Sequence, residues 1–167
     1  KSIFIIICSF FIFYFIYIFL PVSGPQYYFQ AIGLDQATAG NFPDIEHYFY
    51  SHSELLASQD NADGFFYHLV ENSQAAGERP TAAFPSSHVG ISTILMIIVF
   101  KGKKSLFFCM LPFYFFLCGA TVYIQAHYLI DTISGFISAF IIYGISLWIY
   151  ERWLIPSDYC KGEKPTF

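Results

Sequence analysis

Charged residues are scarce in this sequence. Only 12% of its 167 residues are Asp, Glu, Lys or Arg, whereas about a quarter of the residues in soluble domains are charged. Hydrophobic residues make up 56% of the chain and aromatic residues 22%. This composition argues against a domain that folds in water and indicates a membrane protein.

The sequence also lacks a cysteine pattern that could form a disulfide framework. Of its four cysteines, Cys8, Cys109 and Cys118 lie within apolar runs and Cys160 lies near the C-terminus. None falls in the long polar segment between the first two apolar runs. We therefore expect the cysteines to be small packing residues, and we exclude a disulfide-stapled scaffold.

Long uncharged runs, by contrast, are abundant. Four of them cover residues 3–20, 89–100, 106–124 and 133–150. Because a hydrocarbon core about 30 Å thick needs about 20 helical residues, the sequence predicts an all-α, polytopic transmembrane bundle. We expect a single membrane domain over residues 1–167, with spans near 3–20, 86–100, 106–124 and 132–150. A cleaved signal peptide is the alternative for the first run, but the run is long for one and residues 21–24 are a poor cleavage site.

The basic residues gather on one side of these spans. Seven of the eight precede the first span, separate the second from the third, or follow the fourth, and only Arg79 lies elsewhere. The positive-inside rule makes their side cytoplasmic. We therefore expect a multi-pass protein of the inner (cytoplasmic) membrane, with residues 21–85 as an extracytoplasmic loop. Short interfacial helices are expected in that loop at 51–58 and 64–72.

The first polar motif is Pro85-Ser86-Ser87-His88, at the outer start of the second span. A proline followed by serines is typical of a helix N-terminus, where a serine side chain caps the first turn. The unpaired N–H groups and the positive end of the helix dipole favour a bound anion. The motif therefore predicts an anion site beside His88.

The second motif places His127 four residues before Asp131, between the third and fourth spans. This spacing allows a carboxylate to hold one ring nitrogen and leave the other free to react. The two histidines enter from the same side of the membrane, and ionisable groups at membrane depth are functional candidates. A zinc site is the alternative for His88, His127 and Asp131, although the capped helix start suits an oxyanion better.

With these two motifs the sequence resembles the type 2 phosphatidic acid phosphatase superfamily. That family has a Pro-Ser-Gly-His motif at a helix start and, one span later, a histidine followed four residues on by an aspartate. The resemblance covers roughly residues 21–150. The segment at residues 21–25 is also similar to one in the subgroup that includes inositol phosphorylceramide synthases. Because the family usually has six spans and this sequence starts at Lys1 without a methionine, we expect the chain to be trimmed of two.

The resemblance implies a metal-independent mechanism without a cofactor. His127 would attack phosphorus and form a phosphohistidine, Asp131 would orient it, and His88 would protonate the leaving alkoxide. Ser86, with the N–H groups of Ser87 and His88, would hold the phosphoryl oxygens. The expected function is hydrolysis of a lipid phosphate by a protein that contacts membrane lipids and no nucleic acid. The alternatives are a lipid phosphotransferase, which passes a phospho-headgroup to a lipid alcohol, and a non-catalytic lipid-binding member.

Several family positions that are usually basic carry other residues here. Thr121 stands six residues before His127, where the family has an arginine, and Arg79-Pro80 lies closer to His88 than the family's Arg-Pro pair. Gln26 and Gln125 occupy places where arginine is expected in the subgroup. We retain Arg79, Gln26 and Gln125 as further phosphate-binding candidates, and the missing arginines are the argument for the non-catalytic alternative.

Overall fold

The computed structural model describes residues 1–45, 48–50 and 81–154. The interfacial helices expected at 51–58 and 64–72 lie outside the described residues, as does Arg79. Four long helices form the body of the structure. They are α1 (Ser2–Phe19), α5 (Ser87–Gly102), α6 (Lys104–Tyr123) and α7 (Leu129–Ile149), which the π-helical turn η2 (Tyr150–Leu154) extends.

The remaining described elements are short. They are α2 (Pro25–Ile32), α3 (Leu34–Thr38) and the 3-10 turn η1 (Tyr48–Tyr50). Within the described ranges there is no strand, only an isolated parallel bridge between Val22 and Ala82. The predicted all-α class is therefore confirmed.

The outer surfaces of the long helices are apolar. Large side chains such as Ile3, Phe116 and Trp148 are 75%, 78% and 63% exposed, which in water would cost free energy at each site. By length and composition, α1, α6 and α7 with its extension can each cross a membrane, and α5 is apolar but shorter. The structure is thus a helical membrane bundle, and a crossing by α5 stays a prediction.

The helices pack through a small core at which two glycines allow close approach. Phe13 of α1 lies against Gly90 of α5, and Gly135 of α7 lies against the Ser86 carbonyl at the start of α5. One turn further along each helix, Ile94 of α5 and Ala139 of α7 are fully buried. Because a side chain at either glycine would meet its neighbour, these helices approach more closely there than larger residues permit.

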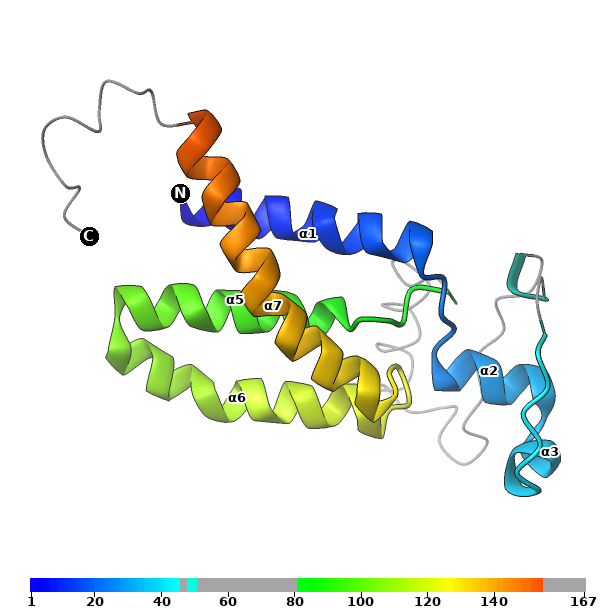
Figure 1. Cartoon of the computed structure of the whole chain (residues 1–167). Coiled ribbons are helices and arrows are strands. Elements are labelled where there is room, and N and C mark those ends of the chain that lie inside the picture. The colour runs from blue at the N-terminus through cyan, green and yellow to red at the C-terminus, as the bar shows by residue number, and fades with distance from the viewer. Residues whose placement is uncertain (46–47, 51–80, 155–167) are drawn as a thin grey trace, which may run out of the picture.

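All the polar motifs come to one end of the bundle. Figure 1 shows that α1 ends, α5 begins, α6 ends and α7 begins at the end where α2 lies, with α7 running obliquely across the other long helices. Each helix boundary lies within three residues of the expected one, and the largest difference is at the start of α7. This helix begins at Leu129 rather than 132 because the Asp131 carboxylate caps it, accepting from the Tyr128 N–H at 2.8 Å.

Candidate functional site

The start of α5 is built as the sequence predicts. Ser86 is its N-cap, and the Ser86 hydroxyl accepts a hydrogen bond from the Val89 N–H at 3.4 Å. Ser86 is fully buried, whereas His88 in the first turn is exposed. The Ser86 N–H donates to the Asp131 carbonyl at 3.0 Å, which ties the start of α5 to the first turn of α7.

Tyr17 is a residue of this site that the sequence analysis missed. Its hydroxyl reaches from α1, donates to the Pro85 carbonyl at 3.0 Å and accepts from the Ser87 N–H at 2.9 Å. Ser87, expected to offer this N–H to a phosphoryl oxygen, therefore uses it within the protein. Nothing in the sequence distinguishes Tyr17 from the other aromatic residues of the first apolar run. Its role depends on the end of α1 lying beside the start of α5, and the sequence does not show this.

The two histidines lie beside each other. Nδ1 of His88 and Nε2 of His127 are 3.4 Å apart, and the ring centroids are separated by 5.6 Å. The His127 side chain is buried, with 4% of its surface exposed, and its Nε2 is directed at the exposed His88. The structure therefore brings the two histidines together, as the sequence predicts.

The other ring nitrogen of His127 donates to a backbone carbonyl and not to Asp131, the partner expected from the sequence. Its Nδ1 lies 2.9 Å from the Ala83 carbonyl oxygen and 4.0 Å from Oδ2 of Asp131. A carbonyl oxygen can only accept, so Nδ1 carries the proton, and the lone pair of Nε2 faces Nδ1 of His88 at 3.4 Å. Asp131 is within ion-pair distance but uses Oδ2 to cap α7. No pattern in the sequence could have singled out the Ala83 backbone.

Burial keeps His127 neutral. It lowers the pKa of His127 from 6.5 to about 4, together with repulsion from His88, while the hydrogen bond to Ala83 acts in the opposite direction. At neutral pH the His127 imidazole is therefore uncharged, and its Nε2 is available as a nucleophile or base.

Gln26, Gln125 and Thr121, which stand where the family or its subgroup has arginine, lie in different settings. Gln26 is buried at the start of α2, and its backbone N–H donates to the Gln125 carbonyl at 3.0 Å. Gln125 itself is exposed and adopts a left-handed conformation, with φ of 59°. Thr121 is buried and donates to the Cys118 carbonyl at 2.9 Å. Among the described residues, no three His, Cys, Asp or Glu side chains lie close enough together to share a metal ion.

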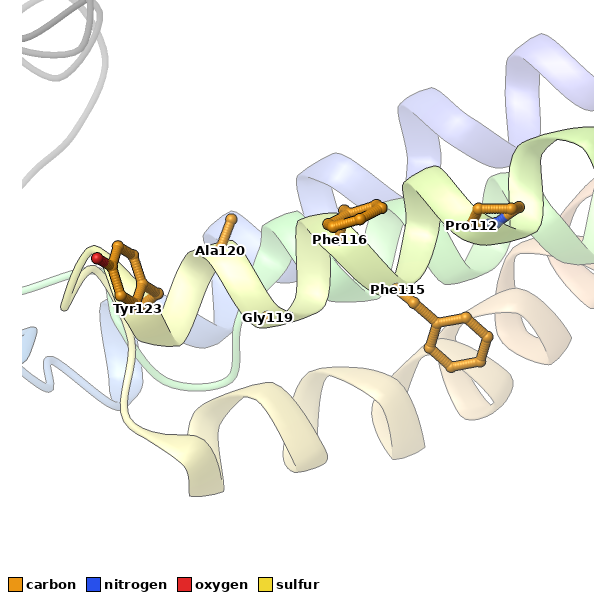
Figure 2. A pocket seen from close by; sticks show the side chains of 6 residues that line it. All are labelled: Pro112, Phe115, Phe116, Gly119, Ala120 and Tyr123. Atoms are coloured by element: carbon orange, nitrogen blue, oxygen red, sulfur yellow. The ribbon is translucent and has the colours of Figure 1, made fainter.

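A groove of about 500 Å³ lies on α6, lined by Pro112, Phe115, Phe116, Gly119, Ala120 and Tyr123. Figure 2 shows these residues along that helix, from its middle to its C-terminal end. The lining is apolar except for the Tyr123 hydroxyl and includes neither histidine. It therefore supplies none of the groups that phosphoryl chemistry requires.

Comparison with known proteins agrees with the two motifs. A family model described as the PAP2 superfamily matches residues 1–145, which include His88, His127 and Asp131. Neither the curated proteins nor the solved structures gave a match.

Proposed function

Because this chain belongs to the PAP2 superfamily, whose activity is of the lipid-phosphate phosphatase type, we propose that it hydrolyses a lipid phosphate with His127 as the nucleophile. The observation that carries the proposal is the approach of His127 Nε2 to His88 Nδ1 at 3.4 Å, while Nδ1 of His127 donates to the Ala83 carbonyl and leaves Nε2 unprotonated. Membership in the subgroup that includes inositol phosphorylceramide synthases stays a prediction.

The first chemical step is displacement at phosphorus. Nε2 of His127 attacks, the P–O bond to the lipid alcohol breaks, and His88 gives its proton to the departing alkoxide. The His127 ring becomes positively charged in this step, and the Asp131 carboxylate at 4.0 Å stabilises that charge. The lipid alcohol leaves, and the phosphoryl group stays on His127.

The second step returns the enzyme to its starting state. His88, now neutral, takes a proton from a water molecule, whose oxygen attacks phosphorus as the P–N bond to His127 breaks. Inorganic phosphate leaves with the oxygen of the water. During both steps the backbone N–H of His88, in the first turn of α5, stabilises a phosphoryl oxygen. The positive end of the helix dipole adds to this stabilisation.

Phosphate release by the full chain, purified in detergent with EDTA present, tests the proposal. The substrates are phosphatidates and isoprenoid pyrophosphates, and the variants are His127→Ala and the distant Gly144→Ala. We expect release from at least one substrate by the wild type and by Gly144→Ala, and a loss of roughly 1,000-fold or more in His127→Ala.

Equal release by wild type and His127→Ala would refute the proposed role of His127. Release that EDTA abolishes would refute the metal-independent mechanism. If a lipid alcohol suppresses phosphate release and becomes phosphorylated, the reaction is phosphotransfer rather than hydrolysis. Absence of release from every substrate would favour a non-catalytic lipid-binding protein.

A further inference from the structure

We propose that the segment Val22–Gln26, between α1 and α2, positions the catalytic histidine by fixing the backbone carbonyl that holds its ring. The inference rests on the proposed role of His127 as the nucleophile. In this arrangement the Ala83 carbonyl orients His127, and Asp131 acts mainly as the cap of α7 and as a nearby negative charge.

The first contact of the segment is with the loop that leads into α5. The Ala83 N–H donates to the Val22 carbonyl at 3.0 Å, and Val22 and Ala82 form the isolated parallel bridge. The carbonyl of the same Ala83 accepts from Nδ1 of His127 at 2.9 Å. Val22 therefore fixes the backbone of Ala83, and the Ala83 carbonyl in turn orients the His127 ring.

The second contact is with the loop that carries His127. A Cβ atom on Gly24 would lie 2.7 Å from the carbonyl oxygen of Ala126, the residue before His127. Gly24 is buried, so this approach leaves no room for a side chain. The segment therefore packs directly against the backbone of the nucleophile's own loop.

The third contact uses an N–H that a helix start leaves unpaired. Pro25 begins α2 and has no N–H, and the next N–H, of Gln26, donates to the Gln125 carbonyl at 3.0 Å. Gln125 adopts a left-handed conformation, which is uncommon for a residue other than glycine. The α2 start thus holds the strained turn from which His127 projects.

Together these contacts join the two loops of the site through one short segment. Val22 bonds to the loop at Ala82 and Ala83, and Gly24 and Gln26 contact the turn at Gln125 and Ala126. This gives a function to the Pro-Val-Ser-Gly-Pro sequence at residues 21–25, which the two catalytic motifs leave unexplained. Gly24 and the Ala83 carbonyl are positioning groups, since each acts only through the loop or the ring of His127.

The test is the tautomer of His127, read by ¹⁵N NMR of the full chain labelled with ¹⁵N-histidine in detergent micelles. Loss of the signal in His127→Gln assigns it. We expect the proton on Nδ1 in the wild type, in Asp131→Asn and in the control Gly144→Ala, where a Cβ meets open space. In Gly24→Ala we expect a mixture of tautomers, because the added methyl group displaces the loop. The NMR reading needs no turnover, so it stands whether or not phosphate release is found.

Three outcomes would overturn the proposal: a proton on Nε2 in the wild type, a changed tautomer in Asp131→Asn, or an unchanged tautomer in Gly24→Ala. Asparagine keeps an oxygen that can accept the Tyr128 N–H, so the start of α7 should survive. If Gly24→Ala does not fold, the wild type and Asp131→Asn alone decide. Where activity is measurable, we expect Gly24→Ala to lower kcat by tenfold or more with KM nearly unchanged.

Discussion

His88 and His127 lie side by side but have opposite surroundings. His88 projects from the first turn of α5 and is exposed, whereas His127 is buried and donates to the Ala83 carbonyl. Burial disfavours the charged form of His127, so it resists protonation. This difference in surroundings supports the proposed roles of His127 as the nucleophile and His88 as the proton donor.

The neutral state of His127 has a cost at low pH. The pKa of His127 is about 4 in the folded chain and 6.5 in the unfolded one, so between these values the unfolded chain binds more protons. The free energy of unfolding therefore falls as the pH falls through this window, by roughly 3 kcal/mol if the whole shift acts. In His127→Gln, which keeps an N–H for Ala83, we expect the melting temperature to fall less between pH 6.5 and 4. An equal fall in melting temperature for the two proteins would contradict the lowered pKa of His127.

At the scale of helices, the site depends on how closely α5 and α7 approach. Gly135 lies against the Ser86 carbonyl, and the Ser86 N–H donates to the Asp131 carbonyl at 3.0 Å. These contacts set the distance between the first turns of the two helices, which carry His88 and Asp131. A small residue at position 135 is therefore needed for the site as well as for packing.

Gly135→Ala tests this contact, because its Cβ would collide with the Ser86 backbone. We expect it to lower the melting temperature, by an overpacking cost of about 1–3 kcal/mol, and to slow lipid-phosphate hydrolysis by moving His88 away from His127. Gly144→Ala, in the same helix with open space around its Cβ, should behave like the wild type in both measurements. Indistinguishable Gly135→Ala and Gly144→Ala proteins would contradict the account.

The helices could be predicted because apolar runs and terminal signals are local features. The Ser86 cap of α5 and the pairing of His88 with His127 belong to this predictable part. Tyr17 and the Ala83 carbonyl could not be found, because one is an aromatic residue among many and the other is a backbone group. Their contacts depend on how α1, residues 82–83 and the segment before α7 are arranged in space. The identity of a single residue does not indicate that arrangement.

At the scale of the molecule, the lysines and the histidine pair lie at opposite ends. Lys101, Lys103 and Lys104 lie at the turn between α5 and α6, and the histidines lie at the end where α2 is found (Figure 1). A charge asymmetry of this kind sets orientation in membranes, with the lysine end cytoplasmic. We therefore expect lipid phosphates of the outer leaflet to be the accessible substrates.

Cysteine labelling in intact cells tests the orientation. In a chain whose four cysteines are replaced by alanine, Asn41→Cys should react with a membrane-impermeant maleimide added outside. Gly102→Cys, at the lysine end, should react only after permeabilisation. Both positions are exposed, so access to each depends on which side of the membrane it faces. The reverse pattern would place the histidine pair on the cytoplasmic side and contradict the expected orientation.

The central claim is that His127 carries the phosphoryl group during turnover, and trapping that intermediate tests it most directly. The full chain is mixed with a ³²P-labelled lipid phosphate, quenched in alkali, which preserves phosphohistidine, and digested for mass spectrometry. The account predicts phosphate on the peptide that contains His127 in the wild type and none in His127→Gln. Turnover without phosphate on His127, or with phosphate on another residue, would contradict the account.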